Sequence, residues 1–150
     1  MKTINELTEK IGINHLNEMQ GTVVKAIQHT TDNIMVLSPT GSGKTLAYIL
    51  PLVCMVDTAS DDLQAIVIVP GRELALQSLN VLRSLGNDVR GYACYGGRPT
   101  MDEHRQLRQL KPHIIFATPG RMNDHIDKDN VDVDSVKWII IDEFDKCLEM

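Results

Sequence analysis

The stretch "SPTGSGKT" (38–45) follows the apolar run "IMVL" (34–37) and precedes a run with helical spacing of apolar residues. A strand, a glycine-rich loop and a helix start form a cradle for phosphate, because backbone N–H groups and the positive end of the helix dipole face the anion. Gly41 and Gly43 let the backbone approach that anion closely. The stretch predicts a phosphate-binding loop, and with it an α/β fold.

Two side chains at the end of this loop suit a bound triphosphate. Lys44 would reach the β- and γ-phosphates, and the Thr45 hydroxyl would ligate Mg²⁺. Ser38 stands where the strict pattern has glycine, and a glycine-rich turn that binds nothing is the alternative. The other residues expected around the phosphates are Thr40, Gly41, Ser42 and Gly43.

The rest of the chain alternates short apolar runs with helix-like stretches. Most of the runs are too uniformly apolar for a sheet with one wet face, so they predict strands buried on both sides of a parallel sheet. Alternating strands and helices predict an α/β fold, a mainly parallel sheet with helices on both faces. The predicted strands are 34–37, 65–69, 92–95, 114–117 and 138–141, and the predicted helices are 17–28, 44–56, 73–85 and 100–110.

The composition is that of one domain with a core, since the chain has 150 residues of which 43% are hydrophobic. No apolar run is long enough for a membrane helix, and the N-terminus lacks a signal-peptide core. The three cysteines are scattered, which favours core thiols over disulfides or zinc, and the five histidines show no ligand spacing. We therefore expect a cytoplasmic protein with no membrane partner.

Positive charge gathers in one segment although the net charge is −5. All seven arginines fall between Arg72 and Arg121, where the net charge is +4, and the rest of the chain carries −9. Clustered arginine suits phosphate recognition, because the planar guanidinium pairs with phosphate oxygens. Solvated helix faces are the alternative.

The run "WIIIDEFD" (138–145) places two acids at the end of a predicted strand. Ligands of parallel α/β sheets bind at the carboxyl ends of the strands. Asp142 could hold Mg²⁺ there, partly through water, and Glu143 could orient and deprotonate the water that attacks the γ-phosphate. An acidic strand end without a catalytic role is the alternative, which the phosphate loop in the same sheet makes weaker.

Two further stretches, "VPGRELALQ" (69–77) and "ATPGRMND" (117–124), each place Pro-Gly-Arg after a predicted strand. Such a turn would bring a backbone N–H group and a guanidinium to the edge where the phosphate loop lies. Pro-Gly is an ordinary turn signal. Its recurrence with arginine favours contacts with a sugar-phosphate backbone.

In order, "SPTGSGKT", "PGRELALQ", the pair Gly96-Gly97, "ATPGRMND" and "DEFD" resemble the motifs of DEAD-box RNA helicases. The resemblance is to their N-terminal RecA-like domain and covers the chain from about Gly12. It implies an ATP-dependent RNA helicase with a RecA-like P-loop fold, ATP and Mg²⁺ as cofactors, and RNA as a partner that is gripped with little regard to sequence. Lys44, Asp142 and Glu143 would be catalytic, and the implied RNA contacts are Arg72, Gly97, Thr118 and Arg121.

The resemblance also divides the chain into an adenine-motif helical segment (1–30) and a sheet core (31–150). Gln20 matches the glutamine that reads adenine, although it could equally be the capping-box residue of the predicted helix. Phe144 stands where the family has alanine. The second RecA-like domain and its arginine finger are absent from the sequence.

The end of the chain, just after "DEFD", leads us to expect a C-terminally truncated domain. Its apolar sheet edge could associate with another copy. Two alternatives to a helicase stay open: a fragment that binds nucleotide or RNA without turnover, and a P-loop ATPase of another family without a nucleic-acid partner.

Overall fold

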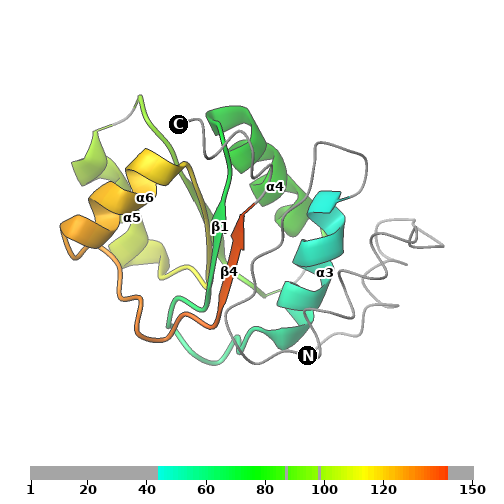
Figure 1. Ribbon diagram of the computed structural model, residues 1–150. Coiled ribbons are helices and arrows are strands. Elements are labelled where there is room, and N and C mark those ends of the chain that lie inside the picture. Colours follow the sequence, from blue (N-terminus) through cyan, green and yellow to red (C-terminus); the bar gives the residue numbers. More distant parts are fainter. Residues whose placement is uncertain (1–43, 87, 98, 142–150) are drawn as a thin grey trace.

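The computed structural model describes residues 44–86, 88–97 and 99–141. A parallel sheet stands between two pairs of helices, with α3 and α4 on one side and α5 and α6 on the other (Figure 1). The predicted α/β class is confirmed. In chain order the elements are α3 (Lys44–Met55), β1 (Ala65–Ile68), α4 (Arg72–Ser84), β2 (Gly91–Cys94), α5 (Thr100–Leu110), β3 (Ile114–Ala117), α6 (Pro119–Asp127) and β4 (Trp138–Ile141).

The four described strands are parallel and lie in the order β2-β3-β1-β4. Ile66 is in register with Ile115 on one side and with Ile139 on the other. Each predicted strand within the described ranges is found to within one residue at either end. The predicted strand at 34–37 and the predicted helix at 17–28 lie outside the described residues.

Alternate strand residues enter two separate cores, as the two-residue repeat of a strand requires. Val67 and Phe116 point toward α3 and α4, where they join a large apolar cluster. Ile66 and Ile115 point the other way and pack in a smaller cluster with Leu107 of α5 and Met122 of α6. Each fully buried side chain of this size contributes about 1.5–3 kcal/mol. Burial on both faces explains why the strands read as continuous apolar runs.

Helix α6 is the element that the sequence analysis did not predict, since Pro119-Gly120-Arg121 reads there only as a turn. In the structure these three residues form the first turn of α6. Proline suits this position because its missing N–H would have no partner inside the helix. The other Pro-Gly-Arg behaves in a similar way, with Gly71 at the N-cap and Arg72 as the first residue of α4.

Cys54 and Cys94 are buried, as expected for core residues, and Cys147 lies outside the described residues. Among the helices that the structure describes, none has the length and apolar character needed to cross a membrane.

Candidate functional site

Three loops that carry predicted site residues meet at the edge of the sheet that is formed by the carboxyl ends of its strands. Arg72 follows β1, Gly97 follows β2, and Thr118 with Arg121 follows β3. Because the strands are parallel, their carboxyl ends share this edge, which is where α/β sheets bind ligands. The structure therefore brings all four predicted RNA contacts to the same side of the molecule.

The first turn of α3 lies at this edge as well. The C-terminal end of α3, at Met55, is tied to the opposite edge, because Asp57 N–H donates to Gln64 Oε1 at 2.9 Å just before β1 begins. A 12-residue helix is about 18 Å long, so its start reaches the other end of the sheet. The helix begins at Lys44, and Thr45 is half-buried in its first turn. A helix N-terminus and a hydroxyl are groups that fit a phosphate with its Mg²⁺.

Seven predicted site residues lie outside the described residues, and their roles stay predictions. Five of them precede α3, and two follow β4 directly in the sequence. They are Gln20, Thr40, Gly41, Ser42 and Gly43, and Asp142 and Glu143.

Arg72 is exposed at the start of α4 and stacks on an aromatic ring. Its guanidinium carbon lies 5.4 Å from the centroid of the Tyr95 ring. Such a cation–π contact contributes about 0.5–1 kcal/mol at an exposed site, and it limits the orientations of the guanidinium. Arg72 is thus held at the edge with its charge open to solvent.

Gly97 adopts a backbone conformation that other residues avoid. Its φ is +92°, in the region that favours glycine, and a Cβ atom there would meet nothing within 4 Å. The exposed pair Gly96-Gly97 follows Tyr95 in a turn. This turn presents backbone without side chains, which allows close approach by a sugar-phosphate chain.

Thr118 links the ends of β2 and β3 through its backbone. Its N–H donates to Cys94 O at 3.1 Å, and its carbonyl accepts from Met122 N–H at 2.9 Å. Its side chain makes no capping hydrogen bond to α6, although Thr118 is the N-cap residue. The half-buried residue therefore keeps its hydroxyl at the edge.

Arg121 is placed differently from Arg72, because its side chain is only 11% exposed and is paired within the protein. Its Nη1 lies 3.2 Å from Oε1 of Glu103, a residue of α5 that is fully buried. His125, also fully buried, places Nε2 2.8 Å from the same oxygen. The other oxygen, Oε2, accepts from Tyr95 N–H at 3.0 Å. Removing one partner of such a buried pair costs about 3–5 kcal/mol.

Comparison with known proteins identifies the family of this chain. Residues 17–150 match the family model described as DEAD/DEAH box helicase. This chain belongs to the DEAD/DEAH box helicase family. The resemblance found in the sequence is confirmed.

Among the relatives of this helicase-family chain is the ATP-dependent RNA helicase CshA of Limosilactobacillus reuteri, 45% identical over 115 residues, which are 74% of this chain and 22% of that protein. The DEAD-box ATP-dependent RNA helicase CshA of Bacillus cereus (strain ATCC 10987) is 40% identical over 147 residues, 95% of this chain and 27% of that protein. The chain thus spans about a quarter of the length of these curated relatives.

The buried cluster in this helicase domain has the composition of a metal site, but a positive charge is paired with its carboxylate. Single ligand atoms of Cys94, Glu103 and His125 lie within 4.8 Å of one another. However, the guanidinium of Arg121 lies 3.2 Å from the carboxylate oxygen that a metal would need, and a positive charge there opposes a cation. We assign the cluster as a network of hydrogen bonds that includes the ion pair between Arg121 and Glu103.

Sequence reasoning missed Glu103 and His125 as members of the site. In the sequence, Glu103 is only one of the acids within the arginine-rich segment from Arg72 to Arg121. A signal was present, because Arg121 and His125 are four residues apart and so share one face of a helix. That signal needs α6 to be recognised first.

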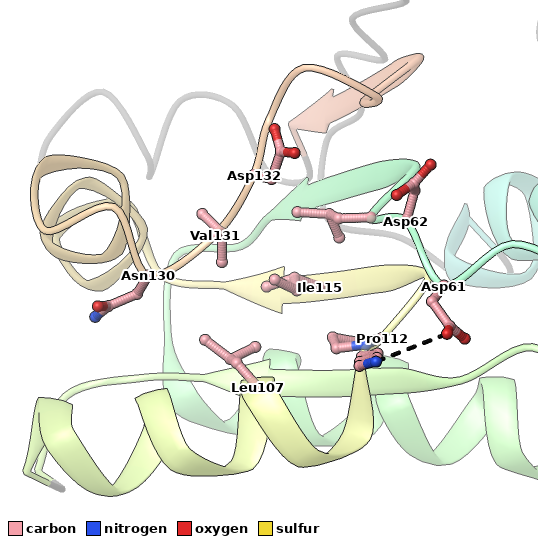
Figure 2. Close-up of a pocket in the computed structure, with 10 residues that line it drawn as sticks. Asp61, Asp62, Leu107, Pro112, Ile115, Asn130, Val131 and Asp132 are labelled. Carbon is pink, nitrogen blue, oxygen red and sulfur yellow. Dashed lines mark ion pairs between the residues drawn. The ribbon is translucent and has the colours of Figure 1, made fainter.

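A separate cavity of about 140 Å³ lies at the other edge of the sheet (Figure 2). Asp61 and Asp62 precede β1, Pro112 precedes β3, and Asp132 precedes β4. These are the amino ends of the strands, opposite the loops described above. The cavity is therefore apart from the helicase motifs, and its ion pair between Asp61 and Lys111, 3.8 Å long, is exposed.

Proposed function

We propose that this chain is the ATP-binding part, and one portion of the RNA-binding surface, of an ATP-dependent RNA helicase. The observation that carries the proposal is the gathering of Arg72, Gly97 and Thr118 at the edge where α3 begins. The family membership and the names of the relatives support it.

On the nucleotide side, Thr45 and Asp142 would hold Mg²⁺, and Lys44 would contact the β- and γ-phosphates. Bound ATP supplies the phosphoryl group that hydrolysis transfers to water. Glu143 would orient the attacking water and accept its proton, since a carboxylate can act as a general base within hydrogen-bond reach. Gln20 would read the adenine edge.

On the RNA side, the groups that the described loops place at this edge suit a sugar-phosphate backbone. Arg72 offers a charge, Gly97 offers accessible backbone, and Thr118 offers a hydroxyl. Contacts of this kind position a nucleic acid without reading its sequence. We therefore propose RNA binding that tolerates different sequences.

We further propose that turnover requires a second RecA-like domain carried by the same protein. ATP and RNA would close the two domains around themselves, and backbone contacts that bend the strand would destabilise a short duplex. An arginine finger from that domain would raise the rate by about 10³–10⁵. The 150-residue chain alone is then expected to bind nucleotide weakly and to hydrolyse it negligibly.

The test is a titration of the ¹⁵N-labelled chain with two unrelated single-stranded RNAs, followed by amide NMR shifts at several salt concentrations. Arg72→Ala should weaken both complexes by a similar factor, and it should lower the slope of log affinity against log salt by about 0.7, as expected for one phosphate contact. Arg83→Ala is the matched control, because Arg83 is exposed in the last turn of the same helix, far from this edge. Equal effects of the two variants, or an Arg72 effect confined to one RNA, would contradict the proposal.

A further inference from the structure

We propose that Glu103 is a positioning residue for RNA binding, which joins the Gly96-Gly97 turn to the first turn of α6. The inference rests on the proposed function, because both segments matter to RNA only if this edge binds RNA. Glu103 itself is fully buried and would touch no nucleotide.

The two oxygens of the Glu103 carboxylate serve two different loops. Oε2 accepts from Tyr95 N–H at 3.0 Å, immediately before the glycine pair. Oε1 accepts from Arg121 Nη1 at 3.2 Å and from His125 Nε2 at 2.8 Å, and both residues belong to α6. The loops follow adjacent strands, and the bond from Thr118 N–H to the carbonyl of Cys94 already ties them. Glu103 adds a second tie closer to the exposed turns.

The hydrogen bonds around His125 fix its role in this tie. The amide nitrogen of Asn130 lies 3.0 Å from Nδ1 of His125, and this nitrogen can only donate. Nδ1 therefore accepts, and the ring proton sits on Nε2, from which it is donated to Glu103. Among the described residues, Arg121 is the arginine paired with this carboxylate. The charge of Arg121 is then matched inside the protein.

A third segment joins through Tyr95. Its N–H is held by Glu103, and its ring lies under the guanidinium of Arg72 at the start of α4. The buried carboxylate is thus connected to all three loops that carry the proposed RNA contacts. Arg121 acts in this arrangement by fixing the start of α6, and the contact that this loop offers to RNA is the half-buried Thr118.

A carboxylate suits this position because Tyr95 N–H, Arg121 and His125 each donate a hydrogen bond to it. Glutamine has the same shape but only one acceptor oxygen, and its amide nitrogen donates. In either orientation of the amide, the NH₂ group would face Tyr95 N–H or the donors of α6. Glu103→Gln therefore loses either the hydrogen bond to Tyr95 or those to α6, and it leaves no cavity.

The test compares RNA affinity, measured by amide NMR shifts of the 150-residue chain at low salt, in the wild type, Glu103→Gln and Asp102→Asn. Asp102 is the matched control, because it is the neighbouring acid on α5 and its side chain is 61% exposed. Each variant removes one negative charge. We expect Glu103→Gln to bind single-stranded RNA about three- to tenfold more weakly, the effect of one lost hydrogen bond. Asp102→Asn should bind as tightly as the wild type or slightly more tightly.

Two outcomes separate this inference from the proposed function. No binding by the wild type would overturn the proposed function and this inference with it. Binding by the wild type that Glu103→Gln leaves unchanged would overturn only the role of Glu103. A purely structural role would lower the melting temperature of Glu103→Gln and leave the affinity of the folded chain intact.

A double variant and the unaltered chain complete the test. Arg121→Gln removes the contact between Glu103 and α6. The double variant with Glu103→Gln should therefore bind RNA no more weakly than the weaker single variant. Losses that multiply would mean that the two residues act independently. In the unaltered chain, RNA should shift the ring nitrogens of His125 together with the amide of Gly97, although His125 is fully buried. An unresponsive His125 would overturn the proposal even if the variants failed to fold.

Discussion

Acid should destabilise this domain through one histidine, His113, which lies just before β3 and is fully buried. Its Nδ1 accepts from Arg90 N–H at 2.9 Å, so its Nε2 carries the proton and donates to the carbonyl of Ser60 at 2.8 Å. The neutral ring therefore joins the segment before β1 to the start of β2. A proton on Nδ1 would place two donors face to face.

Burial lowers the pKa of His113, and the charge of Arg90 lowers it further. The hydrogen bond to Ser60 opposes this shift, as do the nearby carboxylates of Asp61 and Asp57. Unfolded histidine takes up a proton near pH 6.5, whereas His113 in the folded state does so only at a lower pH. Between these two values the unfolded state binds more protons, so stability falls as the pH falls. The slope for one proton is at most about 1.4 kcal/mol per pH unit.

The assay is urea unfolding at a series of values from about pH 8 to about pH 5. His113→Asn is the informative variant, because its side-chain oxygen can still accept from Arg90 N–H but does not titrate. Below about pH 6.5, we expect the free energy of unfolding to fall more steeply with decreasing pH in the wild type than in the variant. The difference in slope is at most about 1.4 kcal/mol per pH unit. Each protein is compared with itself at about pH 8, which removes any general loss of stability. Identical slopes in the two proteins would mean that His113 does not cause the loss of stability in acid.

Three further outcomes are expected. Gly91→Ala should lower the free energy of unfolding by about 1–3 kcal/mol, because its Cβ would lie 2.5 Å from Leu82 Cδ2, and urea titration measures this loss. Gly97→Ala should cost about 1–2 kcal/mol through its φ of +92° alone, and the same titration would show no loss if the turn can readjust. In the protein that hydrolyses ATP, Glu143→Gln should reduce turnover by about 10²–10⁴ while nucleotide binding persists; wild-type turnover would exclude Glu143 as the base.

The sequence predicts the described strands because each is buried on both faces and therefore uninterrupted by polar residues. It does not predict α6, since "PGRMNDHID" has few apolar positions and opens with two residues that are typical of turns. Only Met122 and His125 of this helix are buried, so the apolar repeat that marks a helix is missing. The buried face of α6 can be recognised only when the position of α5, which covers it, is known.

The candidate site is likewise predictable from the sequence only in part. The common edge follows from two features that the sequence predicts: the strands are parallel, and each motif comes directly after a strand. The partner of Arg121 does not, because Glu103 approaches it across 18 positions of the chain only after α5 and α6 pack together. A buried carboxylate on a helix with charged neighbours reads, in sequence, as one more solvated acid.

An RNA helicase whose ATP-binding part is this chain should hydrolyse ATP faster when RNA is bound. The most direct measurement is steady-state ATP hydrolysis by the protein that carries this chain together with the proposed second domain, with and without single-stranded RNA. We predict that RNA of unrelated sequences raises the rate and that Lys44→Ala abolishes it. Hydrolysis that RNA leaves unchanged would contradict the account.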